Sequence, residues 1–536
     1  MRSKWFILVT MTLAVTACSG QPSIQPKPSS GSTPVMQPGQ NPTDEPNLNF
    51  KGDANAYQKG GWSQVVDWPL IAIHAALLPD GNVMTYGTGP DGTGEAFSYD
   101  VWNLKQGLTE DAHTTLPVTT STDIFCSAQA IVPGTGQMFI TGGTIDLDDP
   151  EFDGSSADIN FFDLNDYSLS KSPRQLLAGR WYPTVTTLAN GEVLVHGGRS
   201  APYTPVMTPE VYNPKSGWRE LSNAENDTAY YHWYYPWSFV APDGRVFFTT
   251  ESPRMWFLDA EGAGELEFVG NRPDGLLRGA GSAALYDEGK LLVAGGQQKD
   301  AAGMEVSTET SLLIDINNGK AKVTQAQPMN YKRSEHDLTI LPDGTVLASG
   351  GSAVRNELVD VALEPELWDP NTGEWEVLKA NTTPRLYHST TLLLPDGTLL
   401  MAGGGRPGPI TESGAQLTNT NAELFYPPYL FKKNGSGELA PRLQVLDVEE
   451  PRYAQNFDIQ VGSEDVDRVT LVRAGSVTHA LNMEQRFVEL EFTQNGNTIS
   501  ATAPSKPELA PPGTYLLFVL DSEGVPSYGE MITLGL

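Results

Sequence analysis

Cysteine is scarce in this chain: only Cys18 and Cys126 occur among its 536 residues. Cys18 ends an N-terminal segment that has the features of a lipoprotein signal, where a lipid would consume its thiol. Cys126 would then be an unpaired thiol in a chain exported to an oxidising compartment. Most unpaired cysteines are small buried apolar residues, so Cys126 has this ordinary interpretation beside any chemical one.

Positive charge is also scarce. The chain has 34 Lys and Arg residues against 65 Asp and Glu residues, which gives a formal net charge of −31. Removal of residues 1–17 would take away Arg2 and Lys4 and bring the charge to −33. A surface this acidic repels nucleic acids and anionic lipid headgroups, so we expect neither as a partner.

Long hydrophobic runs are absent beyond the N-terminus. The apolar run Trp5–Val15 is too short to span a bilayer, and it leads into Val15–Cys18, which resembles a lipobox. We therefore expect a signal peptide over residues 1–17 and lipidation of Cys18, with a plain membrane anchor or an ordinary secretory signal as the alternatives. Ser19 is typical of bacterial lipoproteins sorted to the outer membrane. The sequence thus predicts a cell-envelope lipoprotein on the periplasmic or surface face.

Large apolar side chains are nearly missing from residues 18–50, which are rich in Pro, Ser, Gln and Gly. Such a segment cannot bury enough surface to fold, so we expect a disordered tether. The remaining chain is ample for a large core and too long for one ordinary domain. We expect a monomer whose only membrane contact is the lipid.

A hairpin pattern recurs through the rest of the chain. Two apolar strands flank a Gly-containing turn such as Pro-Asp-Gly, and a Gly-Gly pair often ends the second strand. The seven copies start near Ile71, Asp123, Gly179, Tyr235, Leu277, Arg333 and Pro384. Spacings near fifty residues are typical of kelch-type blades, so the sequence predicts an all-β fold with a seven-bladed β-propeller over residues 51–436. An irregular array of β-sandwiches is the alternative.

The fourth copy lacks the Gly-Gly pair and reads Phe247–Ser252 instead, so we expect it to be the least regular blade. The pattern stops after Ala422–Phe431. Residues 437–536 contain alternating strands without the blade signature, which predicts an immunoglobulin-like β-sandwich as a C-terminal domain.

The first strand of each propeller blade lines the central channel. Residues at the start of each repeat therefore converge near the axis, whatever their separation in sequence. Cys126, Tyr182, His336, Tyr387 and His388 occupy such positions. A propeller alone does not fix a function, so these side chains carry the functional prediction.

Four short motifs resemble those of the galactose oxidase and glyoxal oxidase family of copper-radical oxidases. They are Phe125-Cys126, Arg180–Tyr182, Tyr387-His388 and Val477–His479. The similarity extends from about Tyr57 to Leu536. The residues in the motifs at Arg180 and Tyr387 are more similar to those of the glyoxal oxidase branch and its bacterial relatives.

The resemblance implies one copper ion and a catalytic site. Tyr182 would be an equatorial copper ligand joined to Cys126 by a thioether, and this pair would carry a tyrosyl radical. Tyr387 would be the axial ligand and the general base, and His388 and His479 the imidazole ligands. Imidazole and phenolate donors suit Cu(II). The expected reaction oxidises a small aldehyde, a primary alcohol or the end of a carbohydrate, with O2 reduced to H2O2.

Each of these residues also has an ordinary interpretation. Tyr182 and Tyr387 fit channel-lining aromatics, and His388 fits a buried histidine with satisfied hydrogen bonds. The alternative function is a non-catalytic kelch-type module that binds a glycan or a protein. Retention of all five positions favours the oxidase, because a binding module has no chemical reason to keep a cysteine beside a tyrosine.

The substrate side of the site departs from galactose oxidase. Ser200 stands where that enzyme places a tryptophan over the thioether, and Tyr231 stands near its galactose-binding arginine, so galactose is disfavoured. The aromatic run Tyr230–Trp237 is a source of a replacement for the tryptophan, with simple packing as its alternative role. Candidate substrate-binding residues are Tyr231, His232 and His336.

Overall fold

A computed structural model describes residues 50–89, 97–145, 154–201, 204–300, 302–411, 413–463 and 465–535. The signal peptide, the lipidation of Cys18 and all but the last residue of the tether fall outside these residues and stay predictions. No helix in the described part of the chain is long and apolar enough to cross a membrane.

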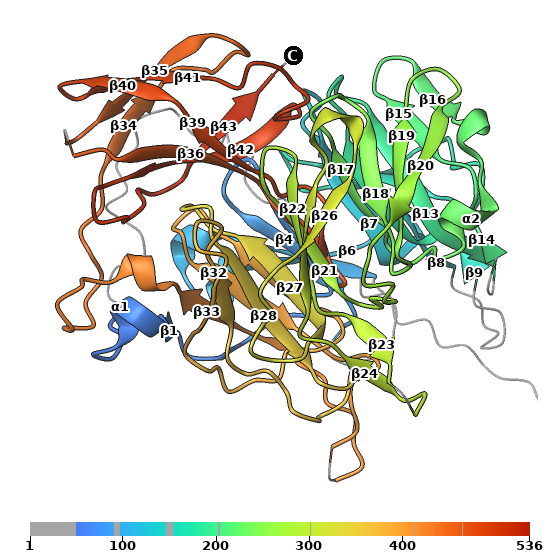
Figure 1. The fold of residues 1–536 in the computed structure, drawn as a ribbon, viewed down its shortest axis with the longest axis horizontal. Coiled ribbons are helices and arrows are strands. Elements are labelled where there is room, and N and C mark those ends of the chain that lie inside the picture. The colour runs from blue at the N-terminus through green and yellow to red at the C-terminus, as the bar shows by residue number, and fades with distance from the viewer. Residues whose placement is uncertain are drawn as a thin grey trace, which may run out of the picture. The chain divides into compact units, whose positions relative to one another are not determined.

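Seven antiparallel sheets form the propeller (Figure 1). The first blade contains β3 (His74–Leu77), β4 (Val83–Gly87), β5 (Ser98–Trp102) and β6 (His113–Pro117), and the second contains β7 (Asp123–Val132), β8 (Gln137–Ile145), β10 (Ile159–Asp163) and β11 (Leu169–Lys171). The third blade contains β12 (Trp181–Thr187), β13 (Val193–Ala201), β15 (Glu210–Asn213) and β16 (Gly217–Glu220). The fourth contains β17 (Trp237–Val240), β18 (Val246–Thr249), β19 (Arg254–Asp259) and β20 (Glu265–Asn271). Two-residue strands β9 (Gly154–Ser155) and β14 (Thr204–Pro205) extend the second and third sheets, and the helix α2 (Asp227–Tyr230) precedes the fourth.

The last three sheets continue this order. They are β21 (Ser282–Asp287), β22 (Lys290–Ala294), β25 (Ser311–Asp315) and β26 (Lys322–Gln325); β27 (Ser334–Ile340), β28 (Val346–Ser352), β29 (Glu366–Trp368) and β30 (Trp375–Val377); and β31 (Ser389–Leu393), β32 (Leu399–Gly403), β33 (Asn421–Tyr426) and β1 (Gly61–Trp62). A small hairpin, β23 (Gln297–Lys299) and β24 (Glu305–Ser307), follows β22. The innermost strands contact one another in the cyclic order β3, β7, β12, β17, β21, β27, β31, with β7 reaching the first sheet through β4. The seven expected hairpins therefore form the inner half of seven blades.

The ring is closed by the N-terminal part of the described chain. After the helix α1 (Ala56–Lys59), β1 pairs with β33 at Gly61↔Tyr426, and β2 (Val66–Asp67) pairs with the same strand. The outer strand of the seventh blade thus comes from the opposite end of the propeller sequence. Two-residue strands carry no periodicity, which is why the sequence does not indicate this closure.

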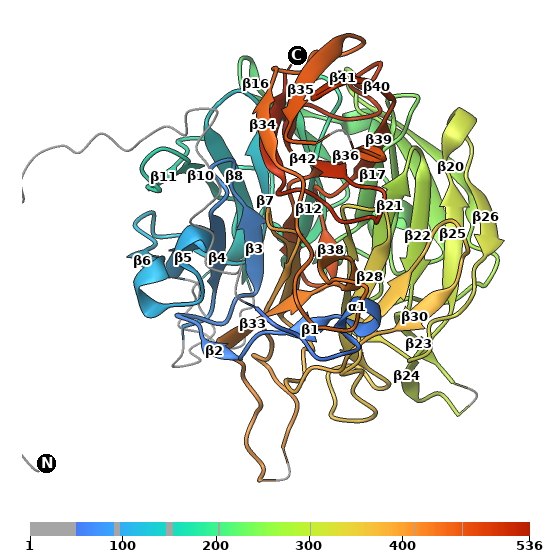
Figure 2. The same ribbon diagram turned by 90° about the vertical axis from the view of Figure 1, so that its left-hand side faces the viewer.

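The C-terminal strands form two four-stranded sheets (Figure 2). One contains β34 (Val445–Val448), β35 (Asn456–Val461), β41 (Thr498–Thr502) and β40 (Phe492–Asn495), and the other contains β39 (Phe487–Leu490), β36 (Arg468–Arg473), β42 (Gly513–Leu520) and β43 (Glu530–Leu534). Inward-facing apolar residues such as Ile459, Leu471 and Leu517 form a core of their own. This is the architecture expected of a sandwich domain.

One hairpin leaves the sandwich and enters the propeller. Its strands are β37 (Ser476–Thr478) and β38 (Leu481–Asn482), and β37 pairs with the inner strand β3 at His74↔Thr478. Ser476 Oγ also donates to the carbonyl oxygen of Gln129 at 2.8 Å. The hairpin therefore brings residues 479 and 480, between its two strands, to the channel.

Buried arginines tie the inner strands of most blades to their neighbours. Arg180, Arg278, Arg333 and Arg385 each donate to the carbonyl oxygen of the first glycine of the Gly-Gly pair in the same blade. Arg180, Arg333 and Arg385 also pair with a buried glutamate, and Arg278 pairs with Asp274. Each ion pair satisfies a charge that would otherwise be costly to bury.

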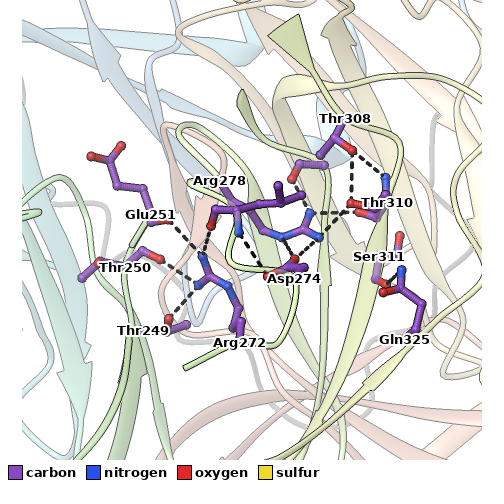
Figure 3. Close-up of polar contacts among 12 residues, drawn as sticks. Thr249, Thr250, Glu251, Arg272, Asp274, Arg278, Thr308, Thr310, Ser311 and Gln325 are labelled. Atoms are coloured by element: carbon purple, nitrogen blue, oxygen red, sulfur yellow. Dashed lines mark hydrogen bonds and ion pairs between the residues drawn. The ribbon is translucent and has the colours of Figure 1, made fainter. Parts of the chain in front are cut away.

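The fourth blade lacks both the glycine pair and this arginine, as its sequence indicates. Arg272, from the loop after β20, donates instead to Thr249 Oγ1 and to the carbonyl oxygens of Thr250, Glu251 and Leu276 (Figure 3). Burial lowers the pKa of Arg272, and the nearby Arg278 lowers it further. The blade thus keeps an arginine clamp, supplied from a different place in the sequence.

Replacement of Arg272 by alanine is expected to lower the free energy of unfolding by about 3 kcal/mol or more, because it removes four hydrogen bonds of a buried guanidinium, two of them to buried acceptors. Urea unfolding of the full chain would measure it. Lys290→Ala is the control, since Lys290 and Asp287 form an exposed pair at 2.7 Å whose loss costs less than about 1 kcal/mol. Equal stability losses in the two variants would contradict the clamp.

Candidate metal centre

Four of the predicted site residues share an unusual backbone conformation. The φ angles are 57° for Cys126, 63° for Tyr182, 69° for His388 and 48° for His479. Left-handed backbone is rare for side chains other than Gly, Asn and Asp, and it clusters at functional sites. In β7 the departure coincides with a register shift between Asp123 and Ser127. The left-handed backbone interrupts the alternation of side chains along the strand, so each of these side chains points in a direction that a regular strand would not give it.

These side chains meet in one buried cluster. One donor atom from each of Cys126, His388 and His479 lies within 4.8 Å of the other two. The Cys126 Sγ to His479 Nε2 distance is 3.6 Å. The hydroxyl oxygens of Tyr182 and Tyr387 are 2.6 Å apart, and the Tyr182 and His479 ring centroids are 5.0 Å apart. All five predicted residues therefore share one site, contributed by three blades and the C-terminal hairpin.

Hydrogen bonds at Nδ1 orient the imidazole rings of His388 and His479. His388 Nδ1 donates to the carbonyl oxygen of Gly405 at 2.8 Å, and His388 Nε2 is buried without a hydrogen-bond partner. His479 Nδ1 lies 2.6 Å from Thr478 Oγ1, which itself donates to the carbonyl oxygen of Ile73. In both rings Nδ1 therefore carries the proton, and the lone pair of Nε2 is available to a metal ion.

Burial sets the protonation states of the cluster. It lowers the pKa of His388 to about 3 and that of His479 well below its usual value, so both rings are neutral at pH 7. It raises the pKa values of Tyr182 and Tyr387, and the Cys126 thiol raises that of Tyr182 further, in part through a hydrogen bond. Two neutral imidazoles and two phenols form a site that a bound cation would complete, because a cation favours the phenolate forms.

Comparison with known proteins shows which family this chain resembles. A family model described as glyoxal oxidase N-terminus matches residues 276–429, and one described as galactose oxidase-like, early set domain, matches residues 441–534. A galactose oxidase of Gibberella zeae is 28% identical over 505 residues, covering 88% of this chain and 70% of the relative. The chain is therefore similar to the galactose oxidase and glyoxal oxidase family over most of its length. It is an oxidoreductase.

Two further proteins are similar to this chain, one in sequence and one in fold. Aldehyde oxidase GLOX1 of Arabidopsis thaliana is 28% identical over 465 residues, covering 78% of this chain and 72% of the relative. A fungal alcohol oxidase of the AA5 family, solved in complex with copper, superposes with a TM-score of 0.78 at 22% identity, covering 89% of this chain and all of that chain. The second likeness shows that the fold is shared.

Two tryptophans lie beside the ring of Tyr182. Trp181 stacks on it with 4.0 Å between centroids and 28° between planes, and Trp233 lies nearly parallel at 6.0 Å and 6°. Arg199 covers the outer side of Trp181, with its guanidinium carbon 4.0 Å from the ring centroid. Ser200 contributes a carbonyl oxygen to Ser155 and no ring. The tryptophans beside Tyr182 thus come from the aromatic run and from the residue that precedes Tyr182 in the sequence.

The three candidate substrate-binding residues lie apart from the cluster. Tyr231 is 67% exposed and contacts His232 edge to face, and His232 Nδ1 lies 2.6 Å from Glu251 Oε1. His336 is buried against Gly295. No hydrogen bond or ring contact among the described residues joins these three to the five-residue cluster. Their part in substrate binding stays a prediction.

A partly buried ion pair beside Tyr387 was not expected from the sequence. Arg355 Nε donates to Glu335 Oε1 at 2.6 Å, and the guanidinium carbon of Arg355 is 6.0 Å from the Tyr387 ring centroid. Glu335 has a φ of 58°, the same left-handed conformation as the cluster residues. Its position two residues after Arg333 matches that of Tyr182 after Arg180, and this repeat is the signal that could have identified it.

The buried imidazole of His196 is expected to make the stability of the protein depend on pH. Its ring contacts Tyr230 and Phe248, neither nitrogen has a partner among the described residues, and burial lowers its pKa to about 3. The unfolded chain binds a proton at His196 below pH 6.5 and the folded chain does not, so this residue lowers stability as the pH falls from 6.5 towards 3.

Replacement of His196 by phenylalanine is therefore expected to reduce the stability lost between pH 7.5 and pH 5 by about 2 kcal/mol. Urea unfolding of both proteins at the two pH values would measure this difference. The same acid-induced loss in both would show that His196 titrates normally in the folded state.

Proposed function

We propose that this oxidoreductase is a copper-radical oxidase, which oxidises a small aldehyde, a primary alcohol or the end of a carbohydrate and reduces O2 to H2O2. The observation that supports it is the single buried cluster of Cys126, Tyr182, Tyr387, His388 and His479, with the Nε2 atom of His388 lacking a protein partner. Nitrogen and oxygen donors of this kind suit Cu(II), which binds most strongly in the divalent series.

Tyr182, Tyr387, His388 and His479 would hold the copper. When bound, the ion supplies one of the two electron equivalents of the reaction and polarises the substrate oxygen. The second equivalent comes from Tyr182, through a tyrosyl radical. Sulfur bonded beside the phenol oxygen lowers the potential at which such a radical forms, and Trp181 and Trp233 exclude water from the ring.

A thioether between Cys126 and Tyr182 is supported by the hydrogen bond between the thiol and the phenol. The bond forms between Cys126 Sγ and a ring carbon of Tyr182, and the thiol hydrogen and one ring hydrogen are lost. The two protons and two electrons pass to O2, which becomes H2O2. A thiol placed within hydrogen-bonding reach of a phenol in a dry site is thereby given a chemical role.

Tyr387 is the proposed general base. Burial raises its pKa, so its phenolate form is a strong proton acceptor, and its hydroxyl group lies 2.6 Å from that of Tyr182. It would take the hydroxyl proton of an alcohol, or of the hydrate that an aldehyde forms with water, while the substrate loses a hydrogen atom from carbon. Each turnover removes two electrons and two protons from the substrate and delivers them to O2, so the reaction balances.

We also propose that the enzyme is a bacterial envelope lipoprotein, anchored by Cys18 and monomeric. The N-terminal sequence supports the anchor, and the acidic composition fits a lipid as its only membrane contact. Cells that produce the protein or its Cys18→Ala variant would be labelled with a radioactive fatty acid. We expect the label in the protein and not in the variant.

The experiment for the oxidase is peptide mass spectrometry after incubation with copper and air. We expect peptides containing Cys126 and Tyr182 to be linked with a loss of two hydrogens, and the link to depend on copper. A Cys126 that still alkylates as a free thiol would contradict the oxidase and favour the alternative of a non-catalytic binding module. The aromatic cover over Tyr182 speaks against that alternative, because a module without turnover has no need of it.

A further inference from the structure

An arginine with unused donors lies next to the proposed general base. Arg355 follows β28 in the sixth blade, and its guanidinium carbon is 6.0 Å from the ring centroid of Tyr387 and 5.8 Å from that of Tyr234. Its side chain is 36% exposed. The residue therefore lies between the buried cluster and solvent.

The hydrogen bonds of Arg355 set it apart from the other arginines of the channel. Arg180, Arg333 and Arg385 direct their terminal nitrogens at backbone carbonyls and buried glutamates. Arg355 uses only Nε, which donates to Glu335 Oε1 at 2.6 Å. Its two terminal nitrogens make no hydrogen bond to another described residue, and neither is buried. Four N–H donors thus remain for a ligand.

Glu335 fixes the orientation of this group and cancels its charge. The carboxylate is almost fully buried, with a side-chain exposure of 1%, so the pair is well shielded from water. A neutral pair with outward N–H donors binds uncharged oxygen acceptors well and gains little from an anion. The overall charge of −31 opposes anions further.

We propose that Arg355, positioned by Glu335, determines the specificity of the oxidase for neutral substrates with a second oxygen atom close to the carbon that is oxidised. Hydroxyaldehydes and polyols belong to this class. The terminal nitrogens of Arg355 donate to that second oxygen while Tyr387 faces the reacting group. This inference rests on the proposed function.

The test compares matched substrates in copper-loaded protein. Glycerol and 1-propanol differ in the extra oxygens, and glycolaldehyde and glyoxylate differ in charge. Arg355→Ala is expected to lower kcat/KM for glycerol about 10- to 100-fold, the effect of losing a hydrogen bond from a charged donor, and to leave that for 1-propanol nearly unchanged. Arg355→Lys should not restore glycerol oxidation, because an ammonium cannot bond Glu335 and present a fork of donors at once.

Glu335→Gln separates the positioning role from a structural one. It removes the negative charge and keeps a hydrogen-bond acceptor, so the ratio of kcat/KM for glyoxylate to that for glycolaldehyde should rise. Arg219→Ala is the control, since Arg219 also pairs with a glutamate, at 2.6 Å and 29% exposed, on the outer strand β16 of the third blade. Copper content and the yield of the cross-link should be unchanged in all variants.

The outcomes distinguish this inference from the proposed function. Equal losses for glycerol and 1-propanol in Arg355→Ala, or no loss in either, would overturn the role of Arg355 and leave the oxidase in place. A wild-type preference for glyoxylate over glycolaldehyde would overturn the neutral substrate class. Wild-type protein that releases no peroxide with any of these substrates and forms no cross-link would overturn both.

Discussion

Replacement of His479 by alanine is expected to lower the affinity for copper by more than about 100-fold and to abolish peroxide release. Loss of a residue that only orients a metal ligand costs 10- to 100-fold in affinity, and loss of the ligand itself should exceed that range. His479 Nε2 is one of only two imidazole donors in the cluster. Competition with a chelator of known affinity, followed by the visible spectrum of the bound copper, would measure the change.

The folded hairpin should survive this substitution. Ser282 Oγ donates to the carbonyl oxygen of Ala480 at 2.7 Å, and Thr478 Oγ1 donates to that of Ile73 at 3.0 Å, so the turn is held without the imidazole. His336→Gln is the matched control, because it removes a fully buried imidazole that has no described contact with the cluster. Normal copper affinity in His479→Ala, or an equal loss in His336→Gln, would remove His479 from the metal site.

Much of the propeller could be predicted because its information is local. A Gly-containing turn between two apolar strands specifies a hairpin by itself, and seven such hairpins at regular spacing specify the blades. The closure of the ring by β1 could not be predicted, because it depends on two residues, Gly61 and Trp62, pairing with a strand more than 350 positions away. The same limit applies to Arg272, which replaces the missing arginine of the fourth blade from a loop.

The metal centre, too, could be predicted from the sequence only in part. Cys126, Tyr182, Tyr387, His388 and His479 lie in motifs that resemble a known family, and the structure brings all five together. Two neighbours that contact them, Trp181 and Thr478, lie in the same motifs, and others do not.

Glu335 and Arg355 reach the neighbourhood of Tyr387 through a left-handed turn and a loop conformation that no short pattern records. Trp233 lies in the aromatic run, but the sequence does not indicate which ring of that run lies beside Tyr182. Position in the repeat alone also placed His336 at the channel. Its side chain packs against Gly295, beside the left-handed turn at Glu335.

Replacement of Cys126 by serine is expected to separate copper binding from turnover. The two imidazoles and two phenols remain, so the variant should retain copper with an affinity close to that of the wild type. Peroxide release should fall to the level of the metal-free protein, because no thioether forms and the Tyr182 radical loses its stabilising sulfur. Serine is nearly isosteric with cysteine and Cys126 is fully buried, so the backbone turn with a φ of 57° should be preserved.

Two measurements on this variant together decide whether Cys126 serves the radical or binds the metal. They are the copper content, and the absorption of the oxidised protein in the visible and near-infrared range. Retained copper with no radical absorption would assign Cys126 to the radical and not to metal binding. Loss of copper would instead make the Cys126 sulfur a metal ligand, in keeping with its 3.6 Å distance from His479 Nε2. Full activity in Cys126→Ser would contradict the thioether outright, because oxidation of the substrate by two electrons would then need another redox partner than the Tyr182 ring.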